Sequence, residues 1–173
     1  MEQKVSTPVQ KGLIISLLLI VFGLVLYFTD MYMNKSLSYL QYVILIGGVI
    51  WSCNSYAKQM NGNVTFGNVF AHGFKTTAFV AALMAVYTFV SVKFLFPDMI
   101  DKIMDSARQE MQKDGNISQE QIDQGIEIGK NFFVPIAIGS ILLFFAIVGA
   151  IASLIGAATA KKNPKDPFGQ PQM

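Results

Sequence analysis

The run from Gly12 to Phe28 is the feature that constrains this chain most, because all but one of its residues are apolar. A helix needs roughly 20 apolar residues to cross a bilayer. Pro8 suits the first turn of such a helix, and Thr7 with Gln10 forms a Thr-x-x-Gln capping box in front of the run. A cleaved secretory signal has an apolar core of only about 7–15 residues. We therefore expect a retained membrane span over residues 12–28.

Three further apolar runs have comparable lengths and cover residues 37–56, 76–96 and 132–160. The chain is 53% hydrophobic and 14% charged, whereas soluble domains are roughly 25% charged. These features predict an all-α integral membrane protein with four transmembrane helices in a single domain, residues 1–160. The remaining residues, 161–173, are rich in proline and lack a periodic apolar pattern, so we expect a disordered tail.

The segment 98–130 is amphipathic instead of continuously apolar. Ile103 and Met104 share one helical face, and the charged residues fall on the other. Ser118 and Gln121 form a second capping box, which predicts the start of another helix. We therefore expect an αα-hairpin between the third and fourth spans, lying on the membrane or extending the fourth span.

The distribution of lysines predicts the orientation of the chain. In a four-span arrangement one side of the membrane receives most of them: Lys4, Lys11, Lys58, Lys75, Lys161, Lys162 and Lys165. The acidic hairpin 98–130 falls on the opposite side. Because cytoplasmic loops carry an excess of lysine and arginine, we expect both termini and the tail in the cytoplasm and the hairpin outside.

Two sets of residues are candidates for a binding role. His72 and Lys75 are one helical turn apart and are positioned for contact with an anionic headgroup, although plain interfacial anchoring is the simpler interpretation. Asp98, Asp101 and Asp105 share a helical face, but a solvated surface explains them better than a Ca²⁺ site does.

Small residues dominate the second half of the last span. The spacing of Ala146, Ala150, Ser153 and Ala157 predicts a close helix contact, with helix 1 or 2 of the same chain or with a second copy. Ser52, Cys53 and Asn54 allow intramembrane catalysis in principle, and they fit equally well as polar residues that pack helices together.

No catalytic or phosphate-binding motif occurs in the sequence, and no acidic residue lies inside a predicted span. We expect no cofactor, no metal and no nucleic-acid partner. The sequence favours a non-enzymatic scaffold or accessory subunit whose partners are the lipid bilayer, a second copy or another membrane protein. The alternative is an oligomeric small-solute or ion channel or transporter, and an enzyme ranks last.

Several short motifs resemble a known family. The turn carries Asn61-Gly62, Phe66-Gly67 and Gly73, and Pro97-Asp98 leads into an acidic helix and a last span that ends in NPKDPF. In order and spacing these resemble small uncharacterised membrane proteins of Bacteroidota that form a domain of unknown function. The resemblance implies a four-span protein of the inner membrane of a Gram-negative bacterium, and it implies no activity.

Overall fold

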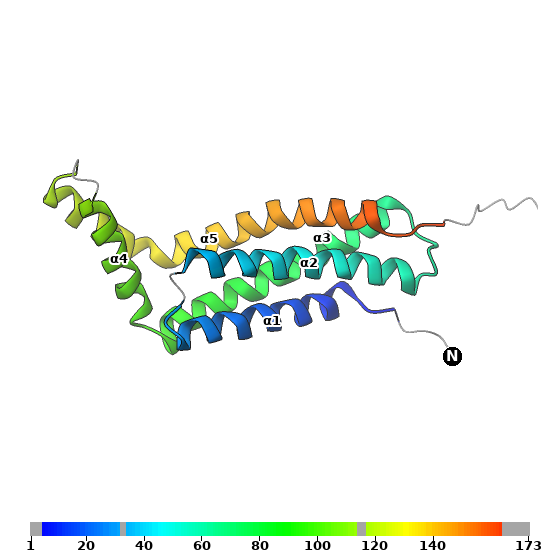
Figure 1. Ribbon diagram of the computed structural model, residues 1–173, viewed down its shortest axis with the longest axis horizontal. Helices are drawn as coiled ribbons and strands as arrows, with labels where there is room; N and C mark the ends of the chain where they lie inside the picture. Colours follow the sequence, from blue (N-terminus) through cyan, green and yellow to red (C-terminus); the bar gives the residue numbers. More distant parts are fainter. Residues whose placement is uncertain (1–4, 32–33, 114–116, 164–173) are drawn as a thin grey trace, which may run out of the picture. The chain divides into compact units, whose positions relative to one another are not determined.

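The computed structural model describes residues 5–31, 34–113 and 117–163. Within these ranges the chain is helical and contains no strand, as Figure 1 shows. The helices are α1 (Pro8–Phe28), α2 (Lys35–Gln59), α3 (Phe66–Val90), α4 (Met99–Lys113) and α5 (Gln119–Thr159), with a π-helical segment, η1 (Ser91–Leu95), after α3. The all-α prediction is confirmed. Most of the predicted tail, residues 164–173, lies outside the described residues.

Three of these helical segments are long and apolar enough to cross a membrane: Pro8–Phe28, Phe66–Leu95 and Gln119–Thr159. They contain the predicted spans 12–28, 132–160 up to its last residue, and nearly all of 76–96. The predicted span 37–56 lies within α2, which has 25 residues and a more polar sequence than these three segments. A membrane protein is therefore supported, and the fourth span stays a prediction.

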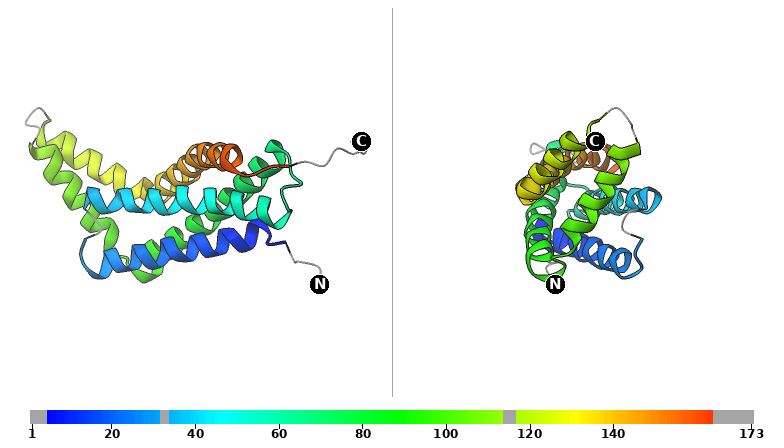
Figure 2. Two further views of the ribbon diagram at one scale, coloured as in Figure 1. Left: turned by 45° about the vertical axis from the view of Figure 1, so that its right-hand side comes forward. Right: turned by 90° about the vertical axis from the view of Figure 1, so that its left-hand side faces the viewer.

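The chain divides into two compact units, and α3 and α5 contribute to both. The first unit comprises residues 1–83 and 144–173. In it α1 and α2 lie side by side and antiparallel, as both views of Figure 2 show. Apolar side chains from several helices are fully buried at its centre, among them Ile15, Leu45, Val49, Val69 and Val80.

Three segments meet at one end of this unit. The Ser6 amide donates to the Gln59 side chain at 2.8 Å, which ties the N-terminal segment to the end of α2. The Asn163 amide donates to the Gly62 carbonyl at 2.7 Å, which ties the segment after α5 to the turn between α2 and α3. That turn has positive φ values at Asn61 and Gly62, of 51° and 74°, as expected for an Asn-Gly pair.

The second unit comprises residues 84–143. In it α4 lies against the first part of α5, and the two share an apolar seam built on Met104, Ile122 and Ile126. The Ser118–Gln121 capping box forms as predicted. From there α5 continues without a break for 41 residues, so the second hairpin helix and the last span are one helix. Pro135 lies inside it.

Candidate functional site

Polar side chains collect in the interior of the first unit, between its apolar helices. The buried ones are Lys11, Ser16, Ser52, His72, Thr76, Thr77 and Ser153. Polar groups inside a membrane protein are costly unless they are paired, so they mark either helix contacts or binding sites. The contacts of each group separate these two roles.

α5 approaches α2 and α3 at glycine positions. A Cβ added to Gly149 would clash with Cγ2 of Thr77, and a Cβ added to Gly156 would lie 2.7 Å from Cβ of Cys53. Nearby, the side-chain amide of Asn54 donates to the Thr159 hydroxyl at the end of α5 at 3.4 Å. The backbones therefore come close enough to exclude a single methyl group, as small residues permit between helices in lipid.

Two of the four residues predicted for a packing face lie in this contact. Ser153 and Ala157 are fully buried, whereas Ala150 is half-buried and Ala146 is exposed. In the first unit the buried face of α5 consists of small residues: Gly149, Ala152, Ser153, Gly156 and Ala157. Gly149 and Gly156, which are seven residues apart, were the sequence signal for this face.

Several hydroxyl groups and the thiol in this interior bind neighbouring helices or their own backbone, whereas the Ser16 and Ser153 hydroxyls have no hydrogen-bond partner among the described residues. The hydroxyls of Ser52 on α2 and Thr76 on α3 lie 3.1 Å apart. Thr77 donates to the carbonyl one turn earlier at 3.1 Å, and the Cys53 thiol donates to the Val69 carbonyl at 3.7 Å. Ser52 and Cys53 are therefore engaged in contacts that hold α2 against α3.

His72 and Lys75 lie in different environments. The His72 ring is buried and stacks on Tyr56, with ring centroids 4.3 Å apart and planes 10° from parallel. Its Nε2 atom has no hydrogen-bond partner among the described residues. Lys75 is exposed, so its ammonium group is free to reach a headgroup while the imidazole faces the protein interior.

Lys11 is the polar residue that sequence reasoning missed as a site. Its side chain is only 7% exposed, its Nζ donates to the Ser55 hydroxyl at 2.9 Å, and Nζ lies 3.8 Å from the centre of the Trp51 ring. No ion pair joins it to a carboxylate in the described ranges. The signal was available, because Lys11 precedes the buried Ile15 by four residues and so shares its helical face.

The acidic face of α4 is occupied by ion pairs. Asp98 pairs with Lys102 at 2.8 Å, and Asp101 pairs with Lys130 at 2.6 Å. Two of the three carboxylates considered for Ca²⁺ therefore already have a cationic partner. Across the part of the chain that the structure describes, no three His, Cys, Asp or Glu side chains come together as metal ligands.

Comparison with known proteins identifies a family but no characterised relative. No curated protein and no solved structure matches the chain. A family model described as "protein of unknown function (DUF4199)" matches residues 10–162. The match covers all five helices except the first two residues of α1. The chain therefore belongs to this family of unknown function, DUF4199.

Proposed function

We propose that this protein is a four-span protein of the bacterial inner membrane that serves as a non-enzymatic scaffold or accessory subunit. Both termini lie in the cytoplasm, and α4 and the first part of α5 lie outside. The headgroup contact of Lys75 belongs to the same proposal, since its exposed ammonium group is on the lysine-rich side.

The meeting of three chain segments supports the four-span topology. The N-terminal segment, the turn after α2 and the segment after α5 are joined at one end of the first unit by the Ser6–Gln59 and Gly62–Asn163 hydrogen bonds. Helices that start and finish at the same end must cross an even number of times. Seven of the twelve lysines of the chain lie in these three segments or in the helix turns that flank them, and the positive-inside rule then favours the cytoplasm for this end.

The observation that carries the scaffold role is the way the polar interior is used. Hydroxyl, thiol and glycine positions of α2, α3 and α5 are engaged in close helix contacts. Such contacts stabilise a rigid bundle in lipid. The α4–α5 pair adds a folded element whose apolar seam is supported by ion pairs from Arg108 to Asp123 and from Lys130 to Asp101. A rigid bundle and a charged helix pair are both features that another membrane protein could bind.

Site-specific photocrosslinking in native membranes tests this function. A photoreactive residue at Gln109, which is exposed on α4, should crosslink to a discrete second membrane protein. The same residue at Met104, which is buried in the seam, should yield only crosslinks within the chain and serves as the control.

The alternative, an oligomeric channel, predicts a different pair of results. The purified protein reconstituted into vesicles would then conduct a small solute or ion, and Gln109 would give crosslinks to a second copy or none. Solute flux combined with the absence of a distinct partner would overturn the scaffold proposal.

A further inference from the structure

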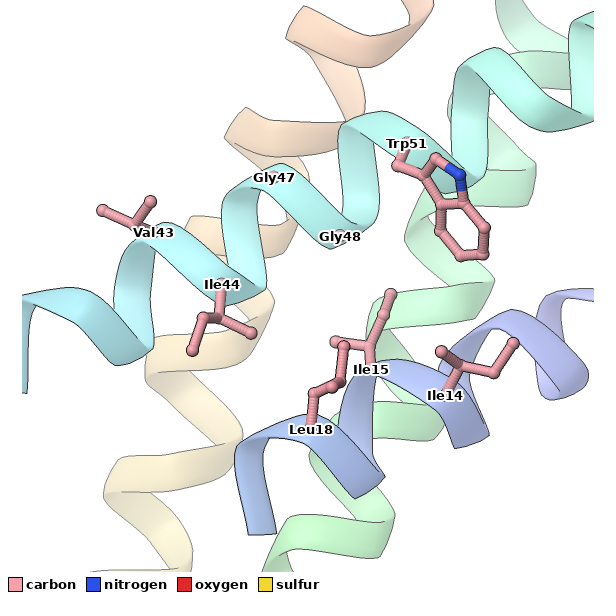
Figure 3. A pocket seen from close by; sticks show the side chains of 8 residues that line it. All are labelled: Ile14, Ile15, Leu18, Val43, Ile44, Gly47, Gly48 and Trp51. Atoms are coloured by element: carbon pink, nitrogen blue, oxygen red, sulfur yellow. The ribbon is translucent and has the colours of Figure 1, made fainter. Parts of the chain in front are cut away.

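An apolar groove runs between α1 and α2 on the first unit. It has a volume of about 400 Å³, within the roughly 300–1,000 Å³ of ligand sites. Its walls are formed by Ile14, Ile15 and Leu18 of α1 and by Val43, Ile44 and Trp51 of α2. Figure 3 shows Leu18 and Ile15 directed toward α2 and Trp51 directed toward α1.

Two glycines form the floor of the groove on α2. A Cβ added to Gly48 would lie 2.9 Å from Ile15, so that glycine is needed for the contact between α1 and α2. A Cβ added to Gly47 meets nothing within 4 Å. The absence of a side chain at Gly47 therefore keeps space open that the packing of this unit does not use.

A cation lies beside the Trp51 end of the groove. Lys11 lies one turn before Ile15 on α1, and its Nζ sits over the ring of Trp51, which is itself a wall residue. An ammonium group has three donors, yet here it has one hydrogen bond, to Ser55, and one aromatic face. A buried cation without a carboxylate is costly, and an anion at this end would complete its ligation.

A groove with apolar walls, next to a cation that no carboxylate neutralises in the described residues, is complementary to one class of ligand. We propose that the α1–α2 groove binds an anionic phospholipid, with one acyl chain along the groove and the phosphate beside Lys11. The position of Lys11 in the first turns of α1 fits this assignment, because a span that starts there places its first turns at headgroup depth. This inference needs α1 and α2 to lie in a membrane and does not depend on the scaffold role.

Trp51 is the only tryptophan in the chain and reports directly on the groove. The purified protein is reconstituted into phosphatidylcholine vesicles that contain a small, equal fraction of brominated phosphatidylglycerol or brominated phosphatidylcholine. Bromine quenches tryptophan on contact. One lysine at the interface predicts a preference of about fivefold for the anionic lipid.

Four variants separate the parts of the site. Lys11→Gln should reduce the preference to about one, and Lys11→Arg should retain it. A Cβ at Gly47 meets nothing within 4 Å, so Gly47→Leu is the change that places bulk in the groove, and it should lower quenching by both brominated lipids. Lys93→Gln removes a charge from an exposed site outside the groove and should leave the preference intact.

Equal quenching of the wild-type protein by the two brominated lipids would overturn the proposal. So would a preference that survives Lys11→Gln, or one that disappears with Lys93→Gln. If Lys11→Gln does not fold, Gly47→Leu decides, because undiminished quenching in that variant would show that the acyl chain does not enter the groove.

Discussion

Gly149→Ala should destabilise the protein although the identical change elsewhere in the same helix should stabilise it. The added methyl group would clash with Cγ2 of Thr77 and lie 2.7 Å from its Cβ. Thr77 is 1% exposed, and its hydroxyl is bound to the Gly73 carbonyl, so it has little freedom to move away. The clash is therefore between a methyl group fixed to the α5 backbone and a Thr77 side chain that is itself held in place.

The magnitude follows from two opposing effects. Overpacking of a filled interior costs about 1–3 kcal/mol, and a contact this short belongs near the upper limit. Replacing a helical glycine by alanine stabilises by about 0.5–1 kcal/mol. We expect a net loss of about 2 kcal/mol for Gly149→Ala, which corresponds to a fall of about 4–8 °C in Tm for a chain of this size.

Gly139→Ala is the matched control. It also lies in α5, and a Cβ there meets nothing within 4 Å, so Tm should rise by a few degrees at most, about 1–4 °C. Thr77→Ser removes the Cγ2 atom and keeps the hydroxyl, so adding it to Gly149→Ala should recover part of the loss. Thermal unfolding in mild detergent, followed by circular dichroism, measures all three. Equal stabilisation by the two alanine substitutions would refute the close approach of α5 to α3.

Three further predictions concern single contacts. Ile122→Ala should cost about 2–5 kcal/mol in the α4–α5 seam and increase proteolysis between residues 98 and 130, whereas Ile128→Ala, at an exposed position, should not. Ser153→Leu should destabilise by about 1–3 kcal/mol in thermal unfolding, whereas Ala146→Leu on the exposed face should be close to neutral; the opposite order would place the wrong face of α5 in the contact. Arg108→Ala breaks a partly exposed ion pair and should change Tm by the equivalent of less than about 1 kcal/mol, so a larger loss would show that the pair is screened from solvent.

Helix starts were predictable because they depend on neighbours in the sequence. The capping boxes at Thr7–Gln10 and Ser118–Gln121 both form, since each needs only hydrogen bonds across one helical turn. The end of a helix was harder to predict where polarity changes without a breaker. The sequence turns apolar near Asn131 and left open whether the hairpin lies on the membrane or extends the last span. Backbone hydrogen bonding continues through this change in α5, so the second hairpin helix extends the last span.

The candidate sites depend on contacts that the sequence does not encode locally. Lys11 was counted as a flanking charge, and its burial became apparent only when Trp51 and Ser55 were brought against it by the pairing of α1 and α2. Which small residues of α5 form the contact depends on the side of the helix that meets Thr77 and Cys53. Spacing alone identified a helix contact, and the partner helices determined which small residues form it.

Cysteine accessibility at three positions tests the four-span arrangement most directly. Single cysteines replace Met31, Lys58 and Gln109, which are all exposed, in a Cys53→Ala background. Cells with a permeabilised outer membrane are treated with an impermeant maleimide. Met31→Cys and Gln109→Cys should react while the inner membrane is intact, and Lys58→Cys should react only after the inner membrane is opened. Reaction of Met31→Cys and Lys58→Cys from the same side would show that α2 does not cross the membrane and would contradict the four-span account.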